Sequence, residues 1–574
     1  MTTVAENIVA QLAANGVQRI YGIPGDSLNG LTDALRKDGS IDWTLVRHEE
    51  AAAFAAAGEA AITGELAVCA GSCGPGNLHL INGLYDAHRS RVPVLAIAAQ
   101  IPSAEIGSNY FQETHPQELF DDCSCYAELV STPEQMPRVL QLAMRAAVEN
   151  RDVAVIVIPG DVALAEAVSQ RVAEIVTSDP TIVPSTRELD LAAEILNQGK
   201  KVTILAGAGT AGAHDELIKV AEVLAAPIVH PLRGKEHVEY DNPYDVGMTG
   251  LIGFASGYRA MENSDTLLML GTDFPYQQFY PRQAKIIQVD LRGDQLGRRA
   301  ELDLGLVGDV KDTLQALLPR LTKHSDRKHL NGSLDHYRKT RKRLDDLATD
   351  DHGRSPLHPQ YVARMIDEMA ADDAVFIPDV GSPVVWAARY LTMNGRRRLI
   401  GSFNHGSMAN ALPHAIGVQS IDPGRQVVAL SGDGGLSMML GELITVAQHR
   451  LPIKIIVFNN SSLNFVELEM KAAGFVTYGT GLDNPDFAVV AEAIGLLGRK
   501  VTRPEELKPA LADAFSYDGP ALVDVSTARQ ELTIPPAITT EQLKGFTLYA
   551  IRTVLSGRGD ELLDLASQNR RQLL

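Results

Sequence analysis

The chain has 574 residues, of which 45% are hydrophobic and 21% charged, and its formal net charge is −19. This length predicts several domains. The acidic excess argues against nucleic acid as the main partner and against bulk attraction to anionic lipid, since both need clustered Lys and Arg, although a local basic patch could still act.

Residues 1–182 are expected to form a first α/β domain. The start of the chain has the pattern of an amphipathic helix and not of a signal peptide. Four short apolar runs end in Gly or Pro turns and predict strands at 20–25, 65–76, 93–100 and 154–161, with a helix over 48–62. No apolar run is long enough to span a bilayer.

Four cysteines lie in this first domain, at positions 69, 73, 123 and 125. They are too few for a disulfide framework in so long a chain, which suggests a reducing cytoplasm. Their C-x-x-x-C and C-x-C spacings fit a zinc site poorly, and small buried residues are the better interpretation.

A linker is expected at 178–189, followed by a second α/β domain over 183–340. Strands are predicted at 201–209, 227–230, 266–273 and 285–290. Gly207, Gly209 and Gly212 have the G-x-G-x-x-G spacing, but the strand at 227–230 ends in His230, where a dinucleotide-binding fingerprint needs an acid. The charged stretch 323–358 is interpreted as a solvated helix and linker.

A third α/β domain is expected over 341–530, with strands near 374–381, 426–435, 453–460 and 521–526. Residues 436–452 have the spacing of one helix, so this region is a strand–helix–strand unit with parallel strands. Asp433 and Asn460 each follow one of these strands. In open α/β sheets the carboxyl ends of the strands form the edge where ligands bind.

The residues at that edge suit a diphosphate held by a metal. Gly432, Gly434 and Gly435 permit close approach to an anion at a helix N-terminus. The side-chain oxygens of Asp433 and Asn460 are hard ligands suited to Mg²⁺. A strand-end turn and a polar cap are the alternative interpretation, which the pairing of the two elements makes less favourable.

The spacing of Gly432–Asp433–Gly434 and Asn459–Asn460 resembles the signature of thiamine-diphosphate enzymes. Residues 47–87 and 403–417 resemble the cofactor-binding segments of the superfamily that contains pyruvate oxidase, pyruvate decarboxylase and acetolactate synthase. Three further segments extend the resemblance over essentially the whole chain: 111–120, 231–253 and 546–566. Taken together, these segments are most similar to the membrane-associated pyruvate:quinone oxidoreductases, also called pyruvate dehydrogenases (quinone). The resemblance implies a pyrimidine-binding, an FAD-binding and a diphosphate-binding domain.

The resemblance also assigns residues to the thiamine diphosphate site. Glu49 matches the acid that activates the cofactor through its pyrimidine ring. Asp433, Asn460 and the carbonyl of Ser462 match the Mg²⁺ ligands. The other matches are contacts to the cofactor: Ser382, His405, Gly406, Ser407, Met408, Gly434, Gly435, Ser461, Leu463, Asn464 and Phe465.

Further matches concern the substrate and the flavin. Residues that line the pyruvate pocket are Phe111, Gln112, Val380, Phe465 and Glu469, of which Phe465 assists electron transfer and Glu469 handles protons. The flavin contacts are Gly250, Leu251, Ile252, Gly253, Thr272, Asp273, Phe274, Pro275, Tyr276 and Gln277, with Asp290 at the adenosine end. The stretch 103–112 lacks the His–His pair of aldehyde-releasing decarboxylases, which favours oxidation.

Residues 531–574 form a tail with apolar residues at helical spacing, among them Leu548, Ile551 and Leu555, and with Arg570 and Arg571 near its end. Such a helix can lie in a membrane interface, although a helix packed on its own domain is equally compatible with the residues. In the resembled family the tail covers the active site at rest and binds phospholipid membrane after flavin reduction.

The resemblance therefore implies a homotetrameric enzyme at the cytoplasmic face of the membrane that oxidises pyruvate to acetate and CO₂ and reduces a membrane quinone. Three alternatives stay open. They are a carboligase of the acetolactate synthase type with structural FAD, a phosphate-dependent pyruvate oxidase that uses O₂, and a non-catalytic binding protein, which Glu49, Asp433 and Asn460 make improbable.

Overall fold

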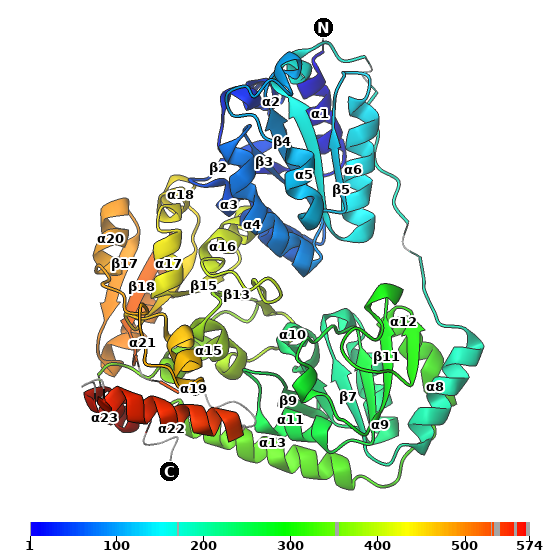
Figure 1. Cartoon of the computed structure of the whole chain (residues 1–574), viewed down its shortest axis with the longest axis vertical. Coiled ribbons are helices and arrows are strands. Elements are labelled where there is room, and N and C mark those ends of the chain that lie inside the picture. Colours follow the sequence, from blue (N-terminus) through cyan, green and yellow to red (C-terminus); the bar gives the residue numbers. More distant parts are fainter. Residues whose placement is uncertain are drawn as a thin grey trace.

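Three six-stranded sheets, each built entirely of parallel strands, run through the chain (Figure 1). The structure is a computed structural model that describes residues 2–168, 171–178, 180–350, 355–529, 531–532, 540–555 and 559–569. Helices flank each sheet, so the predicted α/β fold is confirmed.

The first sheet has the strand order β2-β1-β3-β4-β6-β5. Its strands are β1 (Arg19–Gly22), β2 (Asp42–Leu45), β3 (Ala67–Gly71), β4 (Val94–Gln100), β5 (Tyr126–Leu129) and β6 (Val153–Pro159). Its helices are α1 (Val4–Ala14), α2 (Asn29–Asp38), α3 (Glu49–Thr63), α4 (Pro75–Ser90), α5 (Pro116–Phe120), α6 (Met136–Asn150) and α7 (Gly160–Leu164). The four predicted strands are confirmed, and the edge strands β2 and β5 were not predicted.

The middle sheet has the order β12-β11-β10-β7-β8-β9. Its strands are β7 (Val202–Ala206), β8 (Ile228–His230), β9 (Asp245–Met248), β10 (Thr266–Leu270), β11 (Lys285–Asp290) and β12 (Leu304–Val307). Its helices are α8 (Thr186–Gln198), α9 (His214–Leu224), α10 (Lys235–Val238), α11 (Ala255–Glu262), α12 (Val310–Leu317) and α13 (Lys328–Leu347). The predicted linker reached too far, because a Ser185–Glu188 capping box starts α8 at Thr186.

The third sheet has the order β14-β13-β15-β16-β18-β17. Its strands are β13 (Val375–Pro378), β14 (Arg398–Leu399), β15 (Val427–Gly432), β16 (Lys454–Asn459), β17 (Leu497–Val501) and β18 (Ala521–Ser526). Its helices are α14 (Pro359–Met369), α15 (Ser382–Tyr390), α16 (Ala411–Ile421), α17 (Asp433–Met438), α18 (Glu442–Gln448), α19 (Asn464–Ala472), α20 (Phe487–Ile494) and α21 (Pro504–Ser516).

The single helix predicted over 436–452 is wrong, because the chain forms α17 and α18 with a break between them. Gly441 stands at the N-cap of α18, and glycine is a poor residue for a helix interior. The next residue, Glu442, accepts a hydrogen bond of 3.0 Å from the backbone N–H of Arg47 in the first domain. A contact between domains therefore fixes where the second helix starts.

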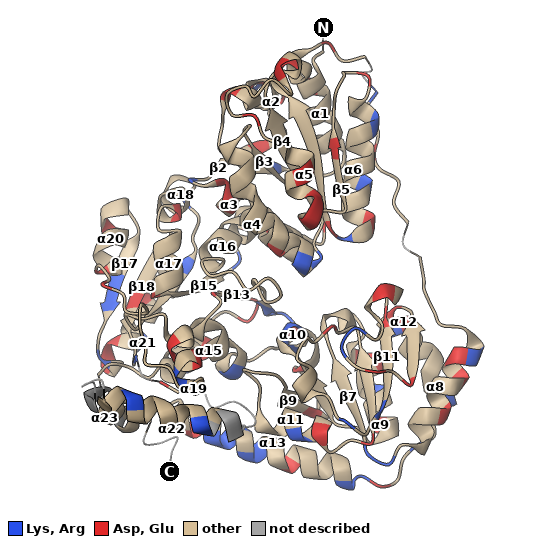
Figure 2. Ribbon diagram, viewed as in Figure 1, with Lys and Arg blue, Asp and Glu red and all other residues tan. Residues whose placement is uncertain are grey.

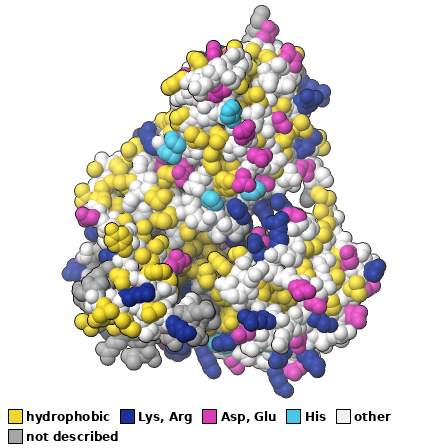
Figure 3. Space-filling model, viewed as in Figure 1, with side chains coloured by type: hydrophobic (Ala, Val, Ile, Leu, Met, Phe, Trp, Pro, Cys, Tyr) yellow, Lys and Arg dark blue, Asp and Glu magenta, His cyan; other side chains and the backbone are white. Residues whose placement is uncertain are grey.

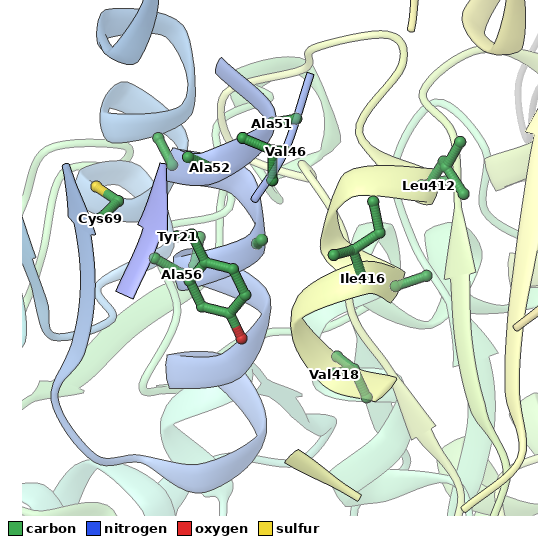
Figure 4. Packing of buried hydrophobic residues seen from close by; sticks show 14 of the residues in the cluster. Tyr21, Val46, Ala51, Ala52, Ala56, Cys69, Leu412, Ile416 and Val418 are labelled. Atoms are coloured by element: carbon green, nitrogen blue, oxygen red, sulfur yellow. The ribbon is translucent and has the colours of Figure 1, made fainter. Parts of the chain in front are cut away.

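The first and third domains share one hydrophobic core (Figure 4). Helix α3 packs against α16, and a Cβ atom added at Gly417 would lie only 1.9 Å from the carbonyl oxygen of Ala55. Every alanine between positions 51 and 57 of α3 belongs to the same buried cluster as Leu412 and Ile416. Phe54, which interrupts this run, does not. Glycine and alanine thus let two helices of different domains approach closely.

The tail forms α22 (Thr540–Leu555) and α23 (Gly559–Gln568). α22 packs on α19, and an added Cβ at Gly545 would lie 1.8 Å from the carbonyl oxygen of Ala472. Arg570 and Arg571 lie outside the described residues. Within the described part of the chain, no helix combines the length and the hydropathy needed to cross a bilayer.

The cysteines are only partly as expected. Cys69, Cys73 and Cys123 are buried, but Cys125 is exposed. Burial raises the pKa of the Cys69 thiol to about 12, so this side chain is a neutral core residue.

Candidate active site

The carboxyl ends of β15 and β16 lie side by side, as the sequence predicts. Gly432 at the end of β15 is in register with Phe458 of β16. The residue after Gly432, Asp433, is 3% exposed. Asn484 Nδ2 donates hydrogen bonds of 2.8 Å to Oδ2 of Asp433 and 3.1 Å to Oδ1 of Asn459, and so links the two strand ends. Sequence reasoning missed Asn484.

Asp433 is a buried carboxylate that several hydrogen-bond donors surround. Burial raises the pKa of Asp433, and hydrogen bonds from Asn484 and from the backbone of Gly434 and Ser461 oppose this rise. The Ser461 contact brings the loop after β16 to Asp433. Ser461 itself has φ of +55°, a left-handed conformation that a non-glycine residue adopts only when its surroundings require it.

The predicted Mg²⁺ ligands Asp433, Asn460 and Ser462 therefore belong to one strand-end loop system. Asn460 Oδ1 accepts a hydrogen bond of 3.0 Å from the Ser462 backbone N–H, and the Ser462 side chain is buried. Among the described residues no group of three or more His, Cys, Asp or Glu side chains could hold a metal. A metal site here depends on one carboxylate with amide and carbonyl oxygens, a donor set that fits Mg²⁺.

The glycine-rich turn after β15 would let the backbone come close to a bound ligand, because it carries no side chains at Gly434 and Gly435. A Cβ added at Gly435 would lie 2.2 Å from Oδ2 of Asp379, so any other residue there would have to displace this buried carboxylate. A Cβ at Gly434 would lie 2.7 Å from Leu463 and 3.4 Å from Met408. The structure thus brings Gly434, Leu463 and Met408 together, three residues expected at the cofactor from separate parts of the chain.

Asp379 is a second residue that sequence reasoning missed. Its carboxylate is 1% exposed and accepts hydrogen bonds from the backbone N–H groups of Ala411 at 2.9 Å and Gly432 at 3.3 Å. Burial raises the pKa of Asp379 to about 7, although these N–H groups oppose the rise. Asp379 directly follows β13, a third strand that ends at the same edge of the sheet. This position could have identified it in the sequence as a candidate site residue.

The segment expected at the aminopyrimidine, 405–408, is bound by Asn82 of α4. Asn82 Oδ1 lies 2.8 Å from His405 Nε2, and its Nδ2 donates to Ser407 Oγ at 3.0 Å and to Glu50 Oε1 at 2.7 Å. Gly406 and Ala409 have φ of +83° and +65°. This strained loop is therefore positioned by the first domain as well as by the third sheet.

Glu49, the expected activating acid, is the first residue of α3 and is 6% exposed. Its Oε2 lies 2.9 Å from His79 Nδ1 on α4, and the His79 ring stacks on His48 with ring centroids 4.2 Å apart. An added Cβ at Gly76 would come within 3.1 Å of Glu49 Oε1. The next residue, Glu50, accepts a hydrogen bond from Asn82, which also contacts the 405–408 segment. The start of α3 is therefore linked through Asn82 to the segment expected at the aminopyrimidine.

The residues expected around pyruvate are more open. Phe111 is 78% exposed, and Gln112, with φ of +63°, accepts a hydrogen bond from the Cys73 thiol. Val380 follows β13, and Ser382 opens α15, whose next residue, Pro383, lies beside the turn at Gly432. Phe465 is partly buried in the third-domain core, and Glu469 is exposed on the same helix, α19. Phe111 and Glu469 are therefore open to solvent in this chain, whereas Phe465 is partly buried.

The segments expected at the flavin follow the carboxyl ends of three strands of the middle sheet, of which β10 and β11 are neighbours and β9 is the edge strand beyond β7 and β8. Residues 250–253 come after β9, residues 272–277 after β10, and Asp290 ends β11. Arg389 of α15 donates hydrogen bonds to the carbonyls of Ile252 at 3.0 Å and Gly253 at 3.3 Å. Burial and the negative charge of Glu469 raise the pKa of Tyr276 in the second of these segments.

The glycines of the G-x-G-x-x-G spacing have a packing reason. Added Cβ atoms at Gly207 and Gly209 would lie 2.4 Å and 2.6 Å from atoms of Gly271, so the loops after β7 and β10 touch. His230 is buried and uncharged, because burial lowers its pKa to about 3.

Comparison with known proteins assigns all three sheets to one family. Residues 2–120, 189–317 and 379–525 match the N-terminal TPP binding domain, the central domain and the C-terminal TPP binding domain of thiamine pyrophosphate enzymes.

Several curated proteins are similar along most of their length. A putative thiamine pyrophosphate-containing protein, YdaP, of Bacillus subtilis is 38% identical over 97% of both chains. The large subunit of acetolactate synthase isozyme 2 of Escherichia coli is 31% identical over 94% of this chain and 98% of its own. A pyruvate oxidase of Lactiplantibacillus plantarum is 29% identical over 90% of this chain and 87% of its own.

Proposed function

Because this chain belongs to the thiamine pyrophosphate enzymes, we propose that it is a pyruvate dehydrogenase (quinone). The reaction converts pyruvate, water and a quinone into acetate, CO₂ and a quinol. The observation that carries the thiamine diphosphate chemistry is the buried Asp433 between Asn484 and the loop at Ser461. Pyruvate as the substrate is supported by relatives named pyruvate oxidase and acetolactate synthase.

Each domain has the role that the resemblance implies. Residues 1–182 bind the pyrimidine, 183–340 bind FAD, 341–530 bind the diphosphate, and 531–574 form a regulatory tail that binds phospholipid. Thiamine diphosphate supplies the electron sink that loss of CO₂ requires, and FAD accepts the electrons. Asp433, Asn460 and the Ser462 carbonyl hold Mg²⁺, while Gly434 and Gly435 let the backbone approach the diphosphate.

The chain's own residues then supply positioning and proton transfer. Glu49 holds the proton that the pyrimidine needs, in a site from which water is largely excluded. Met408 and the backbone of Gly406 orient the cofactor, and Phe465 shields the reacting carbon from solvent. Glu469, whose charge acts on Tyr276 of the flavin segment, moves protons on the substrate side.

The tail supports membrane quinone as the acceptor. α22 covers α19, the helix that carries Phe465 and Glu469. Its outer face is apolar, with Leu548, Ile551 and Leu555 exposed by 45%, 52% and 82%. Figure 3 shows yellow and dark blue side chains together where this helix lies, at the lower left. Exposed apolar residues beside cations are typical of helices at a membrane interface.

The membrane side of the proposal has a direct test. The protein is mixed anaerobically with pyruvate, flavin absorbance is followed, and a quinone is then added with and without liposomes. We expect the flavin to bleach with pyruvate and to recover fastest when quinone and lipid are both present. Reduced protein that does not float with liposomes would contradict peripheral attachment at the cytoplasmic face of the membrane, and light scattering checks the proposed homotetramer.

A carboligase is the second candidate, favoured by the identity to acetolactate synthase over nearly all of that protein. It predicts acetolactate as the product and little flavin bleaching. A phosphate-dependent oxidase, favoured by the pyruvate oxidase relative, predicts that activity with O₂ disappears when phosphate is omitted.

A further inference from the structure

A cavity of about 500 Å³ lies in the middle domain, lined by the residues before β7 and by the neighbouring helices α11 and α13. Its walls carry four cationic side chains, Lys200, Lys201, Arg259 and Lys328, together with His329 and His336. Figure 2 shows Lys and Arg residues along α13. In a chain with a net charge of −19, this concentration of positive charge opposes the overall balance.

The lysines of the cavity are available to a ligand. In the described part of the chain, no carboxylate is ion-paired with Lys200, Lys201 or Lys328. The one carboxylate in the lining, Asp326, accepts a hydrogen bond of 2.9 Å from the Lys328 backbone N–H, and Arg259 pairs with Glu262 at the rim. A second carboxylate, Asp265, lies close by and accepts hydrogen bonds from the backbone N–H groups of Lys200 and Lys201. Three exposed lysines from two segments therefore line the cavity without an ion-pair partner among the described residues.

The floor of the cavity is fixed by a hydrogen-bond chain. The Thr203 hydroxyl donates to the carbonyl of Ala260 at 2.9 Å. It can then only accept from His329, whose Nε2 lies 2.9 Å away and must carry the hydrogen. Burial and the charge of Lys201 lower the pKa of His329, so the ring is neutral and the positive charge of the cavity comes from Lys and Arg.

Gly332 lines the same cavity from within α13. A Cβ atom added there would meet nothing within 4 Å, so the glycine has no packing reason. Glycine is unfavourable inside a helix. Because Gly332 has no side chain, the cavity stays open on the face that α13 provides.

The cavity lies away from the cofactor segments. Lys200 and Lys201 precede β7, whereas the flavin segments follow the carboxyl ends of β9, β10 and β11. In a parallel sheet these are opposite edges. The two edges are joined by α11, which starts after the loop 250–253 and lines the cavity with Arg259.

We propose that this cavity binds a small molecule with two or more phosphate groups, at a site separate from thiamine diphosphate and flavin. Unpaired lysines are compact point charges that suit phosphate oxygens, and the volume suits a ligand from polyphosphate to nucleotide size. A free polyphosphate and a nucleoside diphosphate share this chemistry.

The test is calorimetric titration of the full-length protein saturated with thiamine diphosphate, Mg²⁺ and FAD. The probes are inorganic tripolyphosphate and ADP, with sulfate as the single-anion comparison. We expect one probe molecule per chain, with sulfate binding at least about tenfold more weakly. Binding of both probes shows that the phosphate chain suffices, and binding of ADP alone identifies a nucleotide. Failure of both probes to bind would overturn the proposal.

Two sets of variants separate the cavity from general charge attraction. K200Q/K201Q/K328Q should weaken binding at least about tenfold, whereas the matched triple K219Q/K311Q/K508Q, at exposed lysines elsewhere, should leave it unchanged. G332F should fill the cavity and abolish binding at unchanged charge, with G332A as its control. Equal weakening by both triples, or full binding by G332F, would refute the site even if one lysine variant folds poorly.

Discussion

Oδ1 of Asp379 accepts a hydrogen bond of 2.9 Å from the backbone N–H of Ala411. The other oxygen accepts from Gly432 and would clash with any side chain at Gly435. One buried carboxylate therefore holds the segment expected at the aminopyrimidine against the turn expected at the diphosphate.

The variant D379N tests this arrangement. Asparagine keeps one acceptor but turns its NH₂ group toward a second N–H donor, and an unsatisfied buried donor costs about 1–3 kcal/mol. We expect thiamine diphosphate, with Mg²⁺ present, to bind at least about tenfold more weakly by calorimetry. The matched surface variant D372N should bind normally, and equal affinities of the two variants would contradict the role.

Glu49 and Glu50 are neighbours with separate roles, because Glu49 contacts His79 and Glu50 contacts Asn82. E49Q removes the acid expected to activate the cofactor, and loss of general acid–base catalysis costs about 10²–10⁴-fold in rate. We expect that loss in kcat with cofactor affinity retained. E50Q should lose far less, and comparable kcat losses in the two variants would show that Glu49 is not the activating group.

Asn484 is predicted to hold Asp433 in place for the metal. N484A removes the 2.8 Å hydrogen bond to its carboxylate, and a hydrogen bond to a charged group contributes about 1.5–3 kcal/mol. The Mg²⁺ concentration that gives half-maximal cofactor binding should therefore rise about tenfold or more. N150A, at an exposed amide of the first domain, is the control. An unchanged Mg²⁺ requirement would count against this assignment.

The central strands and the edge where the site lies could be predicted from the sequence, because buried parallel strands are continuous apolar runs that end in glycine turns. Edge strands such as β14 and β17 lack such runs. Asn484 could not be found, since it lies 51 residues from Asp433 and no local pattern relates them. The helical tail was predicted correctly, but the sequence left open whether the helix packs on its own domain or presents an apolar face. In the structure α22 packs on α19 and leaves Leu548 and Ile551 exposed.

The contact between the tail helix α22 and α19 depends on Gly545. G545V should displace α22 from α19, because even a Cβ atom would lie 1.8 Å from the Ala472 carbonyl oxygen. We expect trypsin to cut at Arg552 at least several-fold faster, because this residue now donates a hydrogen bond to the Gly474 carbonyl. G332A, where a Cβ meets open space, should leave the rate unchanged. Identical cleavage of G545V and wild type would refute the contact.

Asp245 makes stability depend on pH. Burial and the nearby charge of Glu239 raise the pKa of Asp245 from 3.8 to about 7. Its contribution to stability is therefore fully present below pH 4 and is lost as the pH rises to about 7. D245N mimics the protonated form and should gain up to about 4 kcal/mol over wild type between these limits. Melting temperatures of both proteins across this range check it, and a constant difference would contradict it.

The close approach of Gly417 to Ala55 has a consequence for biosynthesis. On the ribosome, the alanine-rich face of α3 emerges more than 340 residues before α16, the helix that covers it. The apolar face of α3 in the first domain therefore stays exposed to solvent until the third domain has been synthesised. The whole chain, and not its individual domains, is the unit that completes folding, and the order of synthesis makes the early N-terminal portion a natural client for chaperones.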